Sequence, residues 1–368
     1  MIFANIYRGK RVFVTGHTGF KGSWLCQWLL DLGAEVAGYS IDLPSNPSHF
    51  EALGLGSLLK KHTLGDIRDL AKLQAAMQAF QPEFVFHLAA QPLVRLSYDD
   101  PKGTFDTNVG GTINVMEAIR ATPSVRSAVM IATDKCYENF EWEFGYREND
   151  RLGGKDPYSA SKACAEIAFI SYFKSFFHLA PHLKIASARA GNVIGGGDWA
   201  ADRIVPDLTR AWSRGESAVV RSPKSTRPWQ HVLEPLSGYL WLGAKLVSEP
   251  APQSAVNGES FNFGPGHDAN QSVERLIGEM QKTWTSGRFH VDSAGIGTKK
   301  EAGLLQLNCD KAYGRLKWEP TLSFEQSVQM TASWYRAYAE NSGAKLMTSA
   351  QIREYEQLAR EKRVAWSE

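Results

Sequence analysis

The sequence predicts an α/β fold: a doubly wound parallel sheet of the Rossmann type with a smaller, interleaved C-terminal substrate domain. Two observations carry this prediction. Short apolar runs alternate with helical patterns through the first half of the chain, as in successive strand–helix–strand units. These runs are apolar throughout, as expected of strands that helices cover on both faces.

The expected elements follow one another closely up to about residue 190. Apolar runs predict buried strands over residues 11–15, 35–40, 84–88, 128–133 and 184–189. A further strand is expected to end near Gly65. Apolar residues at helical spacing predict helices over residues 19–32, 108–121 and 158–177.

The pattern changes after Gly191, where a glycine-rich loop precedes more widely spaced elements. We expect a strand over 260–264 and helices over 204–214, 233–247, 272–283, 324–338 and 349–360. This organisation predicts a dinucleotide-binding domain over 1–190, with a return segment near 230–264. Residues 191–368 would form mainly the substrate-binding domain, interleaved with the first.

Composition excludes several classes of partner. The net charge of +2, from 41 basic and 39 acidic residues, gives no electrostatic case for nucleic acid or an anionic membrane. No apolar run is long enough to span a bilayer, and the first residues are too polar for a signal peptide. The cysteines lack CxxC spacing, so we expect no disulfide framework, no metal site and a reducing cytoplasm: Cys26, Cys136, Cys164 and Cys309.

Three glycines follow the first expected strand and open the first helix. Gly16, Gly19 and Gly22 form a GxxGxxG pattern. Glycine allows a tight turn and a close backbone approach to a pyrophosphate at the helix N-terminus. Asp42 comes 20 residues after Gly22, past the second strand, where a carboxylate can accept hydrogen bonds from ribose hydroxyls. This carboxylate would repel a 2′-phosphate and so favour NAD over NADP. The alternative interpretation is that Asp42 is a solvated loop residue that binds no cofactor.

Tyr158 and Lys162 form a YxxxK pair on an expected helix, where positions i and i+4 share one face. A nearby ammonium stabilises a phenolate and lowers the pKa of the tyrosine. The tyrosine can then take a proton from a substrate hydroxyl as hydride leaves the adjoining carbon. The alternative interpretation is that Tyr158 and Lys162 form an exposed helix pair without function. The glycine pattern upstream favours the catalytic interpretation.

Thr133, Asp134 and Lys135 follow the strand before that helix, at the edge where ligands bind in a doubly wound sheet. Thr133 could hydrogen-bond the reacting hydroxyl. A dehydrogenase or epimerase has no need of the acid and the amine that follow. Elimination of water needs both groups, because one protonates the leaving hydroxyl and the other removes a proton from the adjacent carbon.

Several blocks carry a resemblance to the extended short-chain dehydrogenase/reductase superfamily, and within it to the nucleotide-sugar 4,6-dehydratases. They run in family order over roughly residues 5 to 340: TGHTGFKG, HLAAQPLVRLSY, ATDKCY, DPYSASK, ARAGNVIGGGDW, DRIVPD and RPWQHVLEP. They look closest to the branch that acts on CDP-glucose, whose mark is lysine at position 135, where other branches usually have glutamate.

The resemblance implies NAD as the cofactor and a nucleotide sugar, CDP-glucose, as the substrate. It implies cofactor contacts from Tyr158, Lys162 and a set of loop residues: Gly16, Thr18, Gly19, Phe20, Gly22, Asp42, Asp66, Ile67, Leu88, Ala89 and Ala90. The neighbouring His87 is expected to be a packed strand residue.

The resemblance also implies a mechanism. Tyr158 deprotonates the 4-hydroxyl of glucose as hydride passes to NAD, and the 4-keto group makes the C5 proton acidic. Asp134 protonates the departing 6-hydroxyl, hydride returns to C6, and C5 is reprotonated. Whether Lys135 removes the C5 proton itself or orients a water stays open.

On the substrate side the resemblance implies contacts from Asn192, Arg203 and Arg227, the arginines binding the diphosphate. Trp199, Trp229 and His231 either line the nucleotide pocket or belong to the core. The resemblance also implies a homodimer or homotetramer formed through the helices over 108–121 and 158–177.

Other functions remain compatible with the same residues. A dTDP-glucose 4,6-dehydratase or a UDP-sugar 4-epimerase would use the same scaffold. A catalytically silent NAD-binding regulator is the alternative from another class, and the presence of Thr133, Tyr158 and Lys162 together argues against it.

Overall fold

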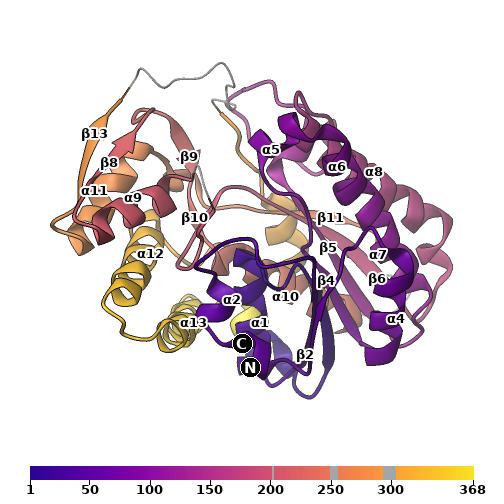
Figure 1. Ribbon diagram of the computed structural model, residues 1–368. Helices are drawn as coiled ribbons and strands as arrows, with labels where there is room; N and C mark the ends of the chain where they lie inside the picture. The colour runs from indigo at the N-terminus through magenta and orange to yellow at the C-terminus, as the bar shows by residue number, and fades with distance from the viewer. Residues whose placement is uncertain (201–202, 249–255, 293–303) are drawn as a thin grey trace.

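A parallel sheet of seven strands forms the centre of the protein. The computed structural model describes residues 1–200, 203–248, 256–292 and 304–368. The strand order is β11-β6-β5-β4-β1-β2-β3 (Figure 1). In chain order the strands are β1 (Arg11–Thr15), β2 (Glu35–Ser40), β3 (Lys61–Leu64), β4 (Phe84–His87), β5 (Ser127–Thr133), β6 (Lys184–Ala190) and β11 (Ser260–Phe263). The predicted doubly wound parallel sheet is therefore confirmed.

Helices cover both faces of this sheet, which explains why its strands are apolar on both sides. In β1, Phe13 packs in the core on the side of α4, α7 and α8, whereas Val12 and Val14 pack on the side of α1 and α10. Figure 1 shows α4, α7 and α8 together along one flank. These helices are α1 (Phe20–Asp31), α4 (Leu70–Phe80), α7 (Gly111–Arg120), α8 (Pro157–Ser175) and α10 (Leu233–Ser248).

The direction of strand addition reverses at β1, which pairs with β2 on one side and with β4 on the other. In open α/β sheets, ligands bind in the crevice beyond the carboxyl ends of the strands beside such a reversal. The loops after β1 and β4 therefore flank the expected site.

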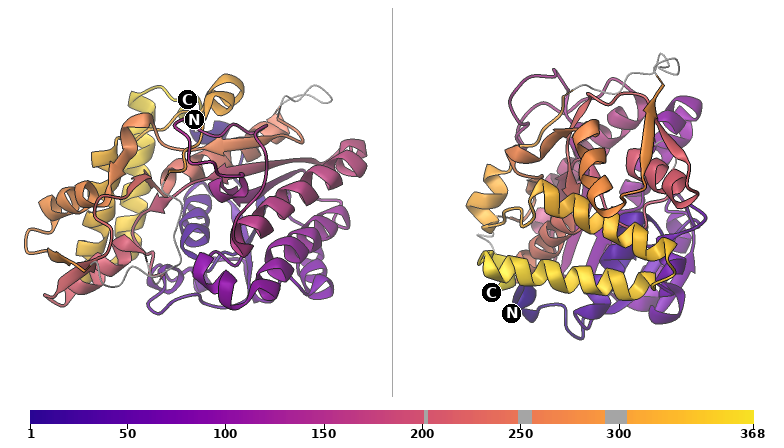
Figure 2. Two further views of the ribbon diagram at one scale, coloured as in Figure 1. Left: turned by 90° about the horizontal axis from the view of Figure 1, so that it is seen from above. Right: turned by 90° about the vertical axis from the view of Figure 1, so that its left-hand side faces the viewer.

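The later part of the chain adds helices and three two-stranded sheets beside the carboxyl edge of the main sheet (Figures 1 and 2). In Figure 2, α12 and α13 run next to each other across this side, drawn in yellow. The helices are α9 (Ile204–Ser213), α11 (Val273–Thr283), α12 (Phe324–Ala339) and α13 (Ala344–Glu361). The paired strands are β7 (Val193–Ile194) with β10 (Gln230–His231), β9 (Thr226–Pro228) with β12 (Asn270–Ser272), and β8 (Ser217–Val220) with β13 (Arg288–Val291).

The two ends of the chain lie together beside α1 (Figure 1). Phe3 stacks on Trp366 with ring centroids 5.0 Å apart, and Trp28 on α1 donates a hydrogen bond to Glu356 on α13 at 2.9 Å. Short helical segments complete the described structure: η1 (Ile2–Asn5), α2 (His49–Ala52), α3 (Leu55–Leu58), α5 (Val94–Asp99), α6 (Pro101–Phe105), η2 (Asp106–Gly110), η3 (Asp134–Cys136), η4 (Phe177–Leu179), η5 (His267–Ala269), η6 (Ala312–Leu316) and η7 (Ala365–Ser367).

Two expected helices differ from those observed. The helix expected over 108–121 is divided into the π-helical segment η2 and α7. A side chain at Gly111 would overlap the side chain of Ile67, so the backbone packs unusually closely where the two segments meet. The helix expected over 349–360 begins earlier, at Ala344, directly after Gly343, whose φ of +87° interrupts the preceding chain.

The main sheet takes one strand from the far half of the sequence. β11 pairs in parallel with β6, and α10 packs on β5 and β6. The expected domain boundary itself stays a prediction. In the described part of the chain, no helix is long and apolar enough to cross a membrane.

Candidate functional site

The turn from β1 into α1 can form only with glycine at Gly16 and at Gly22, which lies in the first turn of α1. Gly16 has a φ of +75°, and a Cβ on it would lie 2.7 Å from the backbone nitrogen of Ala89. A Cβ on Gly22 would overlap the carbonyl oxygen of Gly16. Gly19 is the N-cap of α1, and Phe20 begins the helix. The loop thus lies against the end of β4 and leaves the N-terminus of α1 open to a phosphate group.

The residues expected to hold an adenosine ribose lie beside this loop. The hydroxyl of Thr18 donates to the carbonyl oxygen of Asp42 at 2.6 Å, and the Asp42 side chain is exposed just after β2. His17 is fully buried beneath the loop, where it contacts His62 and Ser40. Burial, together with the neighbouring His62, lowers the pKa of His17 to about 4, so it is neutral at physiological pH.

Asp66 and Ile67 follow β3, as expected. The Asp66 carboxylate accepts hydrogen bonds from the Arg68 guanidinium at 2.6 and 2.8 Å and from the Arg68 backbone N–H at 2.8 Å. These bonds lower the pKa of Asp66. Ile67 is buried against α7. A cofactor contact from Asp66 would therefore come from a carboxylate that Arg68 already engages.

The backbone after β4 completes the inner wall of the loop. The N–H of Leu88 donates to the carbonyl oxygen of Thr15 at 3.1 Å, and that of Ala89 to the Thr15 hydroxyl at 3.3 Å. Leu88, Ala89 and Ala90 are partly exposed. His87 is buried, as expected, between the hydroxyls of Thr15 and Thr112 at 2.7 and 3.0 Å.

The polar residues after β5 meet the first turn of α8. The Asp156 carboxylate caps α8 by accepting from the backbone N–H of Ser159 at 3.0 Å, and this fixes Tyr158 in the first turn. The Thr133 side chain lies near enough to the Tyr158 hydroxyl to lower the pKa of Tyr158. Thr133 in turn donates to the buried Asp134 carboxylate at 3.0 Å. The structure therefore brings the acidic strand end and the phenol to one place.

Lys135 is the cation that bears most directly on Tyr158. Burial raises the pKa of Tyr158, and the positive charge of Lys135 is the largest influence that opposes the rise. The Lys135 ammonium also lies 3.7 Å from the Asp134 carboxylate. The sequence-based hypothesis assigned the opposing charge to Lys162, which is not among the largest influences on Tyr158. The Lys162 ammonium donates to the carbonyl oxygen of Ile131 at 3.2 Å.

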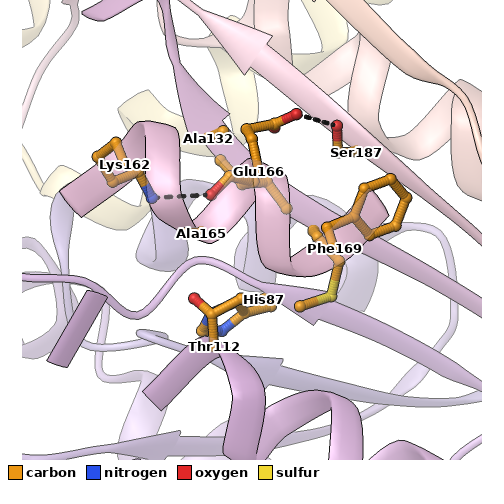
Figure 3. A pocket seen from close by; sticks show the side chains of 10 residues that line it. His87, Thr112, Ala132, Lys162, Ala165, Glu166, Phe169 and Ser187 are labelled. Carbon is orange, nitrogen blue, oxygen red and sulfur yellow. Dashed lines mark hydrogen bonds between the residues drawn. The ribbon is translucent and has the colours of Figure 1, made fainter. Parts of the chain in front are cut away.

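Lys162 is buried on the same face of α8 as Tyr158. It lines a small cavity behind the site together with His87, Thr112, Glu166 and Ser187 (Figure 3). Burial lowers the pKa of Lys162, and the Glu166 carboxylate is the largest influence that raises it.

Lys21 is a site residue that the sequence reasoning missed. It lies in the first turn of α1 and interacts electrostatically with Asp134, Lys135, Lys162 and Arg203. Burial and then the charge of Arg203 lower the pKa of Lys21 to about 8. A lysine between the second and third glycines was a usable signal, because a cation is unfavourable at the positive end of a helix unless an anion compensates it.

The expected substrate residues lie on the later elements. Asn192 lies between β6 and β7, and Arg203 donates to the buried Asp198 carboxylate at 2.7 Å. The charge of Arg203 acts on Tyr158, so this guanidinium belongs to the site cluster. Arg227 lies on β9, where its guanidinium donates to the carbonyl oxygen of Thr226 at 2.8 Å.

The three aromatic side chains whose role the sequence left open are packed in the protein. Trp199 packs edge-on against Tyr335 at 5.2 Å between ring centroids. Trp229 is buried and donates to the carbonyl oxygen of Gln271 at 2.8 Å, and His231 is fully buried. Burial lowers the pKa of His231 to about 3. These contacts favour the core interpretation for Trp229 and His231.

Comparison with known families identifies the family of the chain. A family model described as GDP-mannose 4,6 dehydratase matches residues 13–331. The chain belongs to this family. Among the 85 curated relatives found, one is a CDP-glucose 4,6-dehydratase from Salmonella typhimurium (strain LT2), which is 44% identical over 96% of this chain and 98% of its own length. A probable dTDP-glucose 4,6-dehydratase from Sinorhizobium fredii is 25% identical over 88% of this chain and 92% of its own length.

A solved structure from the same group supports the fold. The dTDP-glucose 4,6-dehydratase of Bacillus anthracis, determined in complex with NAD, superposes with a TM-score of 0.74. It covers 90% of this chain and 98% of its own, at 19% sequence identity. Among the described residues, no group of three or more His, Cys, Asp or Glu side chains is arranged to hold a metal ion.

Replacing Gly22 with alanine tests the close packing of the loop. The added Cβ would overlap the carbonyl oxygen of Gly16, so Gly22→Ala is expected to lower the free energy of unfolding by about 1–3 kcal/mol. Denaturant unfolding measures this change. The control is Gly278→Ala on α11, where no described atom lies within 4 Å of the new Cβ. That change should stabilise the helix by up to about 1 kcal/mol. Equal stability of both variants would disprove the packing argument.

Proposed function

We propose that this chain catalyses the NAD-dependent 4,6-dehydration of CDP-glucose to CDP-4-keto-6-deoxyglucose. The observation that carries the proposal is the meeting of Tyr158, Thr133 and Asp134 at the carboxyl edge of the sheet. This constellation provides a base for a hydroxyl and an acid for a leaving group. The relative from Salmonella typhimurium, named a CDP-glucose 4,6-dehydratase and 44% identical, supports the choice of substrate.

The residues of the β1–α1 loop fit a bound dinucleotide. A Cβ at Gly16 would overlap the backbone of Leu88 and Ala89, and one at Gly22 would overlap the Gly16 carbonyl, so only glycine allows the tight turn that brings the backbone close to a pyrophosphate. The N-terminus of α1 would face the phosphates, and the exposed Asp42 would accept hydrogen bonds from the adenosine ribose. NAD held there would supply the hydride acceptor for C4 and the hydride donor for C6.

Tyr158 acts as the base for the 4-hydroxyl of the sugar. Its hydroxyl lies near the Thr133 side chain, which would hold the reacting hydroxyl in line. Burial disfavours the phenolate, and the charge of Lys135 offsets part of that cost. Lys162 would bind the nicotinamide ribose from the same helix face.

Asp134 and Lys135 carry the elimination step. The 4-keto group makes the C5 proton acidic, and Lys135 removes it or orients a water that does. Asp134 protonates the departing 6-hydroxyl. When hydride returns to C6, the group that took the C5 proton returns it to C5, and Asp134 regains a proton from Tyr158, which holds the one taken from the 4-hydroxyl. The Asp134 and Lys135 side chains lie 3.7 Å apart, so both proton transfers take place beside the same carbon atoms. Net charge and oxidation level are unchanged over the cycle.

The substrate diphosphate would bind Arg203 and Arg227, and Asn192 would contact the sugar nucleotide. Arg203 is the better supported of the two arginines, because its charge already acts on Tyr158. Guanidinium groups bind phosphate oxygens through paired hydrogen bonds. The substrate would then lie between the sheet edge and the later elements, which fits two interleaved domains divided near residue 190.

A homodimer or homotetramer formed through α7 and α8 is part of the proposal. On α8, the exposed side chains Cys164 and Ile167 lie three positions apart on the outer face, and Ile167 is 54% exposed. Phe105 on the adjacent α6 is also exposed. Apolar side chains grouped in this way are typical of helix packing between subunits. The place of action would be the cytoplasm.

A screen of nucleotide sugars tests the function. With NAD present, CDP-glucose should give the alkali-induced absorbance of a 4-keto sugar, with kcat/KM at least tenfold higher than for dTDP-glucose, UDP-glucose or GDP-mannose. A higher value for dTDP-glucose would reassign the substrate. Absence of product with every sugar tested, in a protein that binds NAD, would favour the silent regulator.

Tyr158→Phe should lower kcat by about 10²- to 10⁴-fold, because the variant lacks the base for the 4-hydroxyl. Calorimetric affinity for NAD should stay within a few-fold of the wild-type value. Tyr172→Phe, on the same helix but away from the site, is the matched control and should turn over normally. Wild-type turnover by the Tyr158 variant would remove the phenol from the mechanism.

Asp134→Asn distinguishes dehydration from epimerisation. An amide cannot protonate the leaving 6-hydroxyl, so 4-keto product formation should fall by about 10²-fold or more while the affinity for CDP-glucose changes little. An epimerase would keep interconverting the C4 epimers, which chromatography of the products detects. Asp207→Asn, in a partly exposed ion pair on α9, is the control and should leave the rate unchanged.

A further inference from the structure

A buried ion pair lies directly behind the site. The Arg189 guanidinium donates to the Glu166 carboxylate at 2.5 Å, and the two side chains are 1% and 2% exposed. Buried ion pairs of this kind give little net stability on average, because desolvation offsets the attraction. The position of the pair relative to the site therefore calls for an explanation other than stability.

Glu166 lies one helical turn beyond Lys162 on the buried face of α8. Its Oε2 atom accepts from Arg189, and also from the hydroxyls of Ser187 at 3.1 Å and Ser260 at 3.2 Å. Among the described residues, none donates a hydrogen bond to Oε1. Both Glu166 and Lys162 line the small cavity shown in Figure 3, which has room for about one water molecule.

Several titratable groups surround Lys162. Electrostatic interactions link it to Glu166 on α8, Cys136 after β5, His87 on β4 and Lys21 on α1. The neighbouring elements also carry Tyr158 on α8, Asp134 and Lys135 after β5, and Arg189 on β6. Of these, Glu166 is the one whose charge most favours the ammonium form of Lys162. Burial alone would raise the pKa of Glu166, but Arg189 lowers it overall, so the carboxylate stays ionised.

We propose that Glu166, held in place by Arg189, is a positioning residue that acts on the reaction through Lys162. The carboxylate serves as the buried counter-ion that keeps the Lys162 side chain charged and directed to the ribose side of the site. A water in the cavity would join Oε1 of Glu166 to the ammonium. This inference rests on the proposed function, in which Lys162 binds the nicotinamide ribose beside Tyr158.

The pH profile of kcat/KM for Glu166→Gln tests the role. Removing the anion leaves burial unopposed, so the pKa of Lys162 falls and the lysine loses its proton at a lower pH. The alkaline limb of the profile should move to lower pH by about one unit or more, and activity should recover as the pH is lowered. A uniform loss at every pH would mean a structural role and would overturn the proposal.

A second variant separates a folding defect from the proposed effect on Lys162. Glu166→Gln alone leaves Arg189 buried without its counter-ion, which can unfold the protein. The double variant Glu166→Gln/Arg189→Met removes both charges and should show the same shift of the alkaline limb. Glu279→Gln is the matched control, because Glu279 is a buried carboxylate paired with Lys282 at 2.6 Å on α11. Its profile should match the wild type.

Titration of Lys162 by NMR gives a readout that does not need turnover. Protein labelled with ¹³C at lysine Cε is titrated, and the Lys162 signal is assigned by its loss in Lys162→Arg. The midpoint for Lys162 should be lower in both Glu166 variants than in the wild type. An unchanged midpoint would overturn the proposal. A lowered midpoint in a protein without dehydratase activity would support the coupling of Glu166 to Lys162 and count against the proposed function alone.

Discussion

The packing of α8 against the ends of β5 and β6 is the constraint on which the rest of the site depends. Asp156 and Pro157 start the helix, so Tyr158 falls in its first turn beside Thr133. One turn later Lys162 donates to the backbone of β5, and one turn after that Glu166 binds a side chain of β6. Because residues four apart share a helix face, three successive turns attach the helix to two neighbouring strands.

This attachment gathers positive charge around a single polar centre. Lys135 and Arg203 act on Tyr158, and Lys21 interacts with Asp134 and with the cations Lys135, Lys162 and Arg203. Burial is the largest cause of the lowered pKa of Lys21, and repulsion by these cations adds to it. A ligand that carries a diphosphate relieves this repulsion through charge-assisted hydrogen bonds. The electrostatics of the site therefore suit a dinucleotide and a nucleotide sugar bound side by side.

The parts of this structure that follow from local chain constraints could be predicted from the sequence. The apolar runs predicted the strands, because burial on both faces selects mainly apolar residues, and the glycine spacing indicated the loop at Gly16. The close approach of the backbone at Gly111 could not be predicted, since it depends on Ile67 from a distant segment. The place of Lys21 in the site and the influence of Lys135 on Tyr158 could not be predicted either. Both depend on where long side chains point once several elements meet.

Lys135 links the two halves of the proposed chemistry. A buried phenol is a poor base, because burial favours its neutral form, and Lys135 is the cation that most offsets this effect at Tyr158. The same ammonium lies beside Asp134, the acid proposed for water elimination. A proton gained by Lys135 during elimination would add a positive charge beside the phenol and so favour release of the proton that Tyr158 took from the 4-hydroxyl. In the proposed mechanism, oxidation at C4 and loss of water at C6 would then be coupled through one side chain, which a residue without a titratable amine could not do.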